Sequence, residues 1–164
     1  MTDAGQQPDS GQPGARDARD ARDARDARER GMRARREVLG DAHVDRAVER
    51  TTEFTAPFQD LITRYAWGEI WSRPGLSRAE RSMITLTALA ALRQEEELAM
   101  HVRAAVRNGL TPEQIAEVLL QVAIYAGVPA ANRAFAVAQG VLAEPGAEPE
   151  PGAEPEPEVL PEPG

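Results

Sequence analysis

The stretch Asn108-Gly-Leu-Thr-Pro-Glu-Gln-Ile115 predicts the end of one helix and the start of the next. Gly109 suits the left-handed conformation that closes a helix. Thr111 begins a capping box, in which its hydroxyl and the Gln114 side chain each bond a backbone N–H group. Pro112 fits the first helical turn, where no backbone donor is needed. This junction is typical of a helical domain.

Signals of the same kind continue on both sides of this junction. Ser77-Arg-Ala-Glu80 fits a second capping box, and Gly127 can close the helix that begins at Thr111. Apolar residues recur at helical spacing between these signals, and no strand pattern is present. The predicted helices lie at about residues 41–50, 57–71, 78–92, up to 108, 111–126 and after 129. We therefore expect residues 33–143 to form one all-α domain, a compact bundle of about six helices.

The two ends of the chain have the composition of disordered tails. Residues 1–32 contain a repeated Ala-Arg-Asp triplet and almost no large apolar side chains, so they cannot bury enough surface to offset their ordering entropy. The triplet could form a frayed helix, because Arg and Asp fall opposite one another, but it has no apolar stripe to dock. Residues 144–164 repeat Glu, Pro, Gly and Ala and should be extended. Because Asp nearly balances Arg in the N-terminal repeat, we expect no nucleic-acid binding.

Composition limits the available chemistry. The chain has no cysteine, which excludes disulfides, thiol redox reactions and thiolate metal sites. Its two histidines are too few for a histidine-rich metal site within one subunit, and no glycine-rich nucleotide motif occurs. An enzyme of this composition is expected to use no metal and no cofactor. No apolar run is long enough to cross a membrane, and the N-terminus has no signal-peptide pattern, so we expect a cytoplasmic protein.

One histidine and one carboxylate form a candidate acid/base pair. Glu97 precedes His101 by four residues and therefore lies on the same face of the predicted helix. A nearby carboxylate raises the pKa of a histidine, whereas burial lowers it, so the pair could be tuned toward neutral pH. The alternative is a solvated pair on a helix surface with no chemical role.

The apolar residues of the domain favour an oligomer. Alanine is abundant and aromatic residues are few, so each buried side chain contributes little area. The segment from Thr111 to Ala126 is apolar on most sides, as expected for a helix packed against both a core and a partner. We expect a homo-oligomer. Trp67 and Trp71 are predicted to form core or subunit contacts rather than a substrate wall.

Several motifs in order resemble the carboxymuconolactone decarboxylase family, within the alkylhydroperoxidase-like superfamily. They are Arg81-x-x-x-x-Leu86-x-Ala88, Glu97-Leu-x-x-His101-x-x-x-Ala105, the junction at 108–115, Tyr125-x-Gly127-x-Pro129, and the upstream blocks 36–44 and 63–71. The alkylhydroperoxidase branch instead carries Cys-x-x-Cys-x-x-x-His. Gln94 and Glu97 occupy those cysteine positions here, which excludes thiol peroxidase chemistry at this site.

The resemblance implies a cofactor-free decarboxylation of 4-carboxymuconolactone to 3-oxoadipate enol-lactone, in the protocatechuate branch of the β-ketoadipate pathway. It also implies rings of small subunits, hexamers or trimers. His101 would donate a proton or a hydrogen bond, and Glu97 would orient it. Arg81, Tyr125 and His43 are candidate substrate-binding residues.

Each of these three residues has a structural alternative. Arg81 could form a surface ion pair with Glu80 or a neighbouring subunit, Tyr125 could be a buried tyrosine bonded to a backbone carbonyl, and His43 could lie on a helix surface or reach the pocket of an adjacent subunit. The whole domain could also act on a different lactone or acidic substrate, or be a non-enzymatic helical assembly module.

Overall fold

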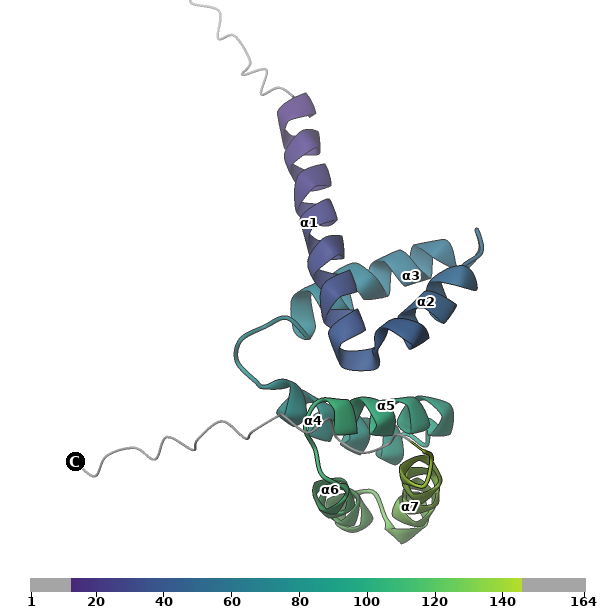
Figure 1. The fold of residues 1–164 in the computed structure, drawn as a ribbon. Coiled ribbons are helices and arrows are strands. Elements are labelled where there is room, and N and C mark those ends of the chain that lie inside the picture. The colour runs from purple at the N-terminus through teal and green to yellow at the C-terminus, as the bar shows by residue number, and fades with distance from the viewer. Residues whose placement is uncertain (1–12, 146–164) are drawn as a thin grey trace, which may run out of the picture.

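The computed structural model describes residues 13–145, and within them every regular element is a helix (Figure 1). The elements are α1 (Pro13–Leu39), α2 (Asp41–Glu49), α3 (Ala56–Ile62), the π-helix η1 (Thr63–Ile70), α4 (Arg78–Ala91), α5 (Glu95–Arg107), α6 (Pro112–Tyr125) and α7 (Val128–Leu142). The predicted all-α fold is confirmed, with one helix more than expected at the N-terminus and a π-helix that the sequence pattern did not reveal. No helix in this range is both long and apolar enough to span a membrane.

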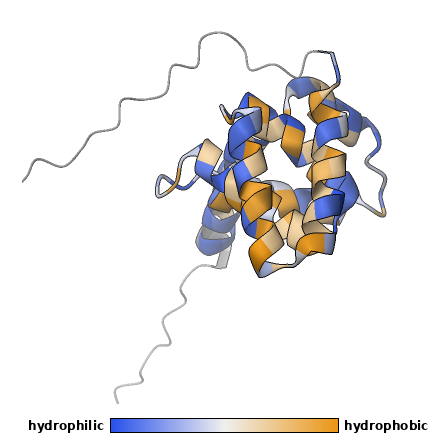
Figure 2. Ribbon diagram, turned by 90° about the horizontal axis from the view of Figure 1, so that it is seen from below, coloured by the Kyte–Doolittle hydropathy of each residue, from blue (hydrophilic) through white to orange (hydrophobic). Residues whose placement is uncertain are grey.

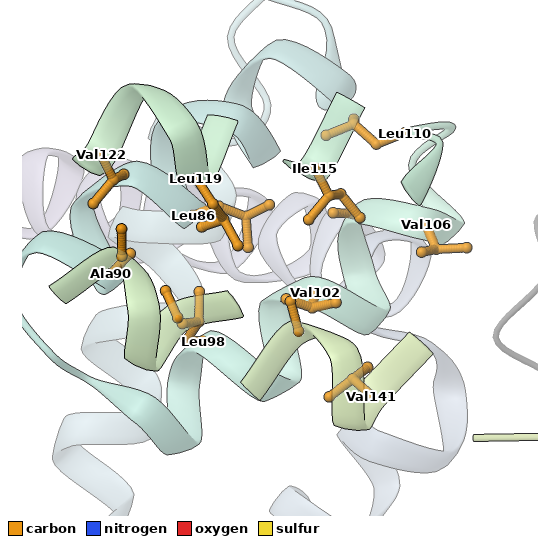
Figure 3. Packing of buried hydrophobic residues seen from close by; sticks show 14 residues of the cluster. Leu86, Ala90, Leu98, Val102, Val106, Leu110, Ile115, Leu119, Val122 and Val141 are labelled. Carbon is orange, nitrogen blue, oxygen red and sulfur yellow. The ribbon is translucent and has the colours of Figure 1, made fainter. Parts of the chain in front are cut away.

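Helices α4 to α7 pack around the larger of two apolar cores, shown in Figure 3. Both predicted capping boxes are present: the Ser77 hydroxyl accepts from Glu80 N at 3.2 Å, and the Thr111 hydroxyl accepts from Gln114 N at 3.2 Å. They fix where α4 and α6 begin. The fully buried side chains of this core include Leu86, Leu98, Val102, Leu110, Ile115, Leu119 and Val122.

Helices α1 to α3 and η1 form a second unit above α4 and α5 in Figure 1. Its smaller core contains Val38, Leu39, Val44 and Trp67, and Ala104 of α5 completes it. An ion pair between Arg78 and Glu37 also joins α4 to α1. Helix α5 therefore contributes side chains to both cores.

Two glycines let α1 and η1 cross with their backbones in contact. A Cβ atom on Gly31 would overlap the carbonyl oxygen of Thr63 and would lie 2.9 Å from Gly68 N. A Cβ atom on Gly68 would overlap the carbonyl oxygen of Ala27. Only glycine fits at either position, so this crossing fixes the height of η1 along α1 and with it the position of both tryptophans.

We expected residues 1–32 to be a disordered tail whose repeat could form a frayed helix, and residues 13–32 of this segment belong to α1. The C-terminal part of α1 is docked by the buried Ala34, Val38 and Leu39. Extending a helix that already has a docked turn costs little, and Arg and Asp three or four residues apart favour the extension. Arg28 also pairs with Asp60 of α3 at 2.6 Å. The expectations for residues 1–12 and 146–164 lie outside the described residues.

Candidate functional site

His101 lies at the junction of the two units because α5 has two buried faces. Leu98, Val102 and Ala105 point into the larger core, while His101 and Ala104 point toward α1 and η1. The His101 side chain is only 9% exposed. Its ring stacks on Trp71 with a centroid distance of 6.3 Å and an interplanar angle of 18°. An aromatic wall therefore covers the candidate acid/base residue.

The π-helix builds that wall. In η1 the backbone hydrogen bonds span five residues, as in the bond from Trp71 N to Ala66 O at 2.9 Å. The rings of Trp67 and Trp71 stack with centroids 5.1 Å apart, and the Ser72 hydroxyl donates to Trp67 O at 2.7 Å. Trp67 packs in the smaller core, as predicted, but Trp71 also contacts the candidate site, and π-turns are frequent at functional sites.

Burial determines the charge state of His101. It lowers the pKa of the imidazole to about 4, with a further lowering from the neighbouring His43 and a smaller opposing effect from Glu97. The Nδ1 atom of His101 is buried and has no hydrogen-bond partner among the described residues. His101 is therefore neutral at pH 7 and has an unused polar atom.

Glu97 acts on His101 through its charge but does not orient the imidazole ring by a hydrogen bond. The carboxylate raises the pKa of His101, as predicted, yet it is exposed and no hydrogen bond joins the two side chains within residues 13–145. The expectation that the two effects bring the pair toward neutral pH is not met in the free chain, because burial exceeds the attraction of Glu97.

The stability of the fold should fall as His101 is forced to take up a proton. The unfolded chain binds this proton below pH 6.5, whereas the folded chain binds it only at about pH 4, so stability is full above pH 6.5 and is lost toward pH 4. The loss from this residue is roughly 3 kcal/mol at most. Burial and the charges of Arg35, Arg46 and Arg103 lower the pKa of His43 and add to the trend.

Urea unfolding at pH 7 and pH 4.5 measures this effect. The His101→Gln variant, which cannot take up the proton, should lose clearly less stability over this range than the wild type. Carboxylates elsewhere titrate in both proteins, so the difference between the two isolates His101. Equal losses would mean that His101 is not buried as described.

Arg35 is a functional candidate that sequence analysis missed. It lies on α1, is 6% exposed, and donates from Nη1 to the side-chain oxygens of Gln59 at 3.0 Å and Thr63 at 3.5 Å. Its Nε atom is buried without a partner, and no carboxylate forms an ion pair with it within the described residues. The signal was its place in the inward-facing series Gly31, Ala34, Arg35 and Val38, where a charge is unexpected.

His43 lies within range of the charges of both Arg35 and His101. It lies on α2 and is half-buried, and the charge of Arg35 lowers its pKa after the larger effect of burial. In turn His43 lowers the pKa of His101. Of the five predicted site residues, Glu97 and His43 are the two whose charges act on His101 within one subunit.

No hydrogen bond or ion pair joins Arg81 or Tyr125 to this group in the described part of the chain. Arg81 is half-buried and donates from Nη2 to Arg73 O at 2.9 Å, and the described structure shows no ion pair between Arg81 and Glu80. The charges that shift the His101 pKa come from His43 and Glu97, not from Arg81. Tyr125 is 81% exposed at the end of α6, so the alternative of a buried tyrosine is wrong. Their predicted roles in substrate binding therefore stay predictions.

Two further features bear on the site. Residues 13–145 contain no cluster of three or more His, Cys, Asp or Glu side chains that could hold a metal ion.

A groove of about 580 Å³ runs between α6 and α7. Its wall is mainly apolar and contains none of the predicted site residues, so it is a separate surface.

Comparison with known proteins identifies relatives along most of the chain. The model of the Carboxymuconolactone decarboxylase family matches residues 56–140. A 4-carboxymuconolactone decarboxylase of Acinetobacter baylyi is 46% identical over 119 residues, which cover 73% of this chain and 89% of the relative. A nitrosuccinic acid decarboxylase of Metarhizium robertsii is 42% identical over 66% of this chain and 76% of the relative. A 4-carboxymuconolactone decarboxylase of Pseudomonas putida is 56% identical over 39 residues, 24% of this chain and 81% of the relative.

Proposed function

Because the chain belongs to the carboxymuconolactone decarboxylase family, we propose that it converts 4-carboxymuconolactone to 3-oxoadipate enol-lactone and CO2. The observation that carries this proposal is the 46% identity to a 4-carboxymuconolactone decarboxylase over nearly its whole length. The buried His101 and the unpaired Arg35 supply groups that fit the reaction. The reaction belongs to the protocatechuate branch of the β-ketoadipate pathway.

The substrate provides its own electron sink. The carboxylate that leaves is on the ring carbon gamma to the lactone carbonyl, across a double bond, so the electron pair of the broken C–C bond moves into the carbonyl as an extended enolate. A proton then adds to the carbon alpha to the carbonyl. The dianionic substrate and one proton thus give CO2 and a monoanionic enol-lactone, with no oxidation or reduction.

His101 would stabilise the enolate and supply the proton. A neutral imidazole donates one N–H bond, and preformed donors in a site that excludes water stabilise developing negative charge strongly. A bound dianion raises the pKa of a buried histidine, because an opposite charge nearby favours the protonated form. His101 would therefore gain its proton when substrate binds, with Glu97 favouring the same form.

A second acidic substrate is favoured by one relative. The nitrosuccinic acid decarboxylase of Metarhizium robertsii is nearly as similar to this chain, and nitrosuccinic acid also carries two carboxyl groups. The guanidinium of Arg35 would suit either carboxyl group. This is the alternative of a same-fold enzyme with a different acidic substrate.

Release of CO2 from freshly prepared 4-carboxymuconolactone by the purified protein tests the proposal. The reaction is run without added metal or cofactor, beside a control without enzyme and a parallel assay with nitrosuccinic acid. Rapid release from the lactone alone would support the first candidate. Release from nitrosuccinic acid alone would favour the second, and release from neither would refute both.

We also infer a homo-oligomer larger than a dimer, since each subunit exposes two separate apolar surfaces. One follows residues 54–65, with Phe54, Phe58, Leu61 and Tyr65 at helical spacing and more than half exposed. The other lies on α6 and the start of α7, where Leu120 is 50%, Ile124 78% and Val128 69% exposed. Figure 2 shows many hydrophobic residues on the helices seen from below. One self-complementary surface gives a dimer, whereas two allow a trimer of dimers, consistent with a hexamer.

Variants on the two surfaces should dissociate the oligomer in steps. Phe58→Glu and Ile124→Glu each place a charge in one apolar surface, so each should give a smaller oligomer, and the double variant should be monomeric. Size-exclusion chromatography with light scattering measures the masses. A monomeric wild type, or single variants with unchanged mass, would contradict the inference.

A further inference from the structure

We propose that Arg35 is the anchor for the carboxylate that the substrate retains, in a binding site formed with His43 at the junction of α1, α2 and α5. The family model begins at residue 56, so the family match assigns no role to either residue. The choice of a dicarboxylic substrate rests on the proposed function.

The first argument is the charge of Arg35, which nothing in the described structure neutralises. Its partners, Gln59 and Thr63, are neutral, and its buried Nε atom donates to nothing within residues 13–145. A buried ion without a counter-charge is strongly unfavourable, even where hydrogen bonds remain. Arg81 also has a buried Nε atom without a partner, but it is less buried than Arg35 and donates to the carbonyl oxygen of Arg73. The unpaired guanidinium of Arg35 indicates that its counter-ion is a ligand.

The second argument is that the neighbouring groups are also donors. The guanidinium of Arg35 lowers the pKa of His43, and His43 in turn lowers the pKa of His101. The Nδ1 atom of His101 is the other unpartnered buried nitrogen at this junction. A planar guanidinium binds a carboxylate through two parallel hydrogen bonds. The exposed Glu97 acts on His101, but no acidic side chain among the described residues forms an ion pair with Arg35.

The third argument decides which carboxylate Arg35 binds. The carboxylate that leaves becomes neutral CO2, so a strong ion pair to it would be lost in the transition state and would slow the reaction. The retained carboxylate keeps its charge throughout, so an ion pair to it serves binding without opposing catalysis. Arg35 therefore binds the carboxylate that is retained. The carboxylate that leaves lies toward the stacked rings of Trp71 and His101.

Steady-state kinetics of an Arg35→Met variant test this role. Loss of a charged pair that serves binding alone should raise KM by roughly a hundredfold while kcat changes by no more than about threefold. Arg35→Lys, which keeps the charge but not the planar fork, should recover part of the loss. Arg33→Gln is the matched control, since Arg33 is exposed on the same helix and should keep the wild-type KM.

Thermal melting gives a readout independent of turnover. Without ligand, Arg35→Met should melt at a higher temperature than the wild type, because it removes an uncompensated buried charge. Succinate, a dicarboxylate that is not turned over, should raise the melting temperature of the wild type and of Arg33→Gln but not of Arg35→Met. Inorganic phosphate should have a smaller effect than succinate.

Each contrary result overturns the assignment. A destabilised Arg35→Met variant with unchanged KM would make Arg35 a structural residue. No effect of succinate on the wild type, or an equal effect of phosphate, would refute a carboxylate site. A fall in kcat with unchanged KM would mean that Arg35 binds a group formed in the transition state. If the wild type decarboxylates neither acid, the proposed function fails, but the melting results still decide whether Arg35 binds a carboxylate.

Discussion

His101→Gln is expected to lower kcat for CO2 release by roughly a hundredfold to ten-thousandfold, the usual contribution of a positioned acid/base group. His101 is the buried titratable residue of α5 that faces the smaller core, and its ring is stacked on Trp71. Glutamine has a similar length and keeps a hydrogen-bond donor, but it cannot deliver a proton. The residual activity would report stabilisation of the enolate by a donor alone.

Two controls separate this effect from damage to the fold. Circular dichroism and oligomeric mass should match the wild type in the His101→Gln protein. Glu96→Gln changes an exposed carboxylate on the same helix and should leave kcat within about twofold. Turnover by His101→Gln at the wild-type rate would remove His101 from the mechanism.

Gly31→Ala is expected to produce the largest loss of stability, about 3 kcal/mol, because the added methyl group has no space. The Cβ atom would overlap the carbonyl oxygen of Thr63, and backbone cannot turn aside as a side chain can. Relief requires α1 and η1 to move apart. Since η1 carries Trp67 and ends at Trp71, turnover should fall as well.

A second glycine provides the matched control with the opposite sign. Gly140 lies in α7, and an added Cβ atom there meets nothing within 4 Å. Gly140→Ala should therefore stabilise the protein by about 0.5 to 1 kcal/mol, because alanine favours helix. Urea unfolding of the two variants measures both effects. A Gly31→Ala protein as stable as the wild type would contradict the close backbone crossing.

Local signals in the sequence were sufficient to predict the positions of helices α4 to α7. The hydroxyl of Thr111 and the amide of Gln114 act within one helical turn, so their effect does not depend on the rest of the fold. The ordered part of α1 was missed because it depends on contacts with distant residues, such as the ion pair between Arg28 and Asp60. No comparable local signal in the sequence indicated that η1 would be a π-helix rather than an α-helix.

For the candidate site too, the relations within one helix could be predicted, whereas contacts between distant residues could not. The four-residue spacing of Glu97 and His101 placed them together, and a helix fixes that relation. The burial of His101, the stacking of Trp71 and the isolation of Arg35 arise only when α1 and η1 pack on α5. Arg81 and Tyr125 matched family motifs, but a motif match gives no information on which face of the subunit a side chain occupies.

The two apolar cores differ in size, so the two units should differ in the free energy that local opening costs. The larger core holds 14 buried residues from α4 to α7, whereas the smaller holds five, one of them from α5. A cooperative unit with less buried apolar surface opens at a lower free-energy cost than global unfolding. The backbone amides of α1, α2 and η1 should therefore exchange with deuterium faster than those of α5, and such partial opening gives ligands a transient route to the buried imidazole.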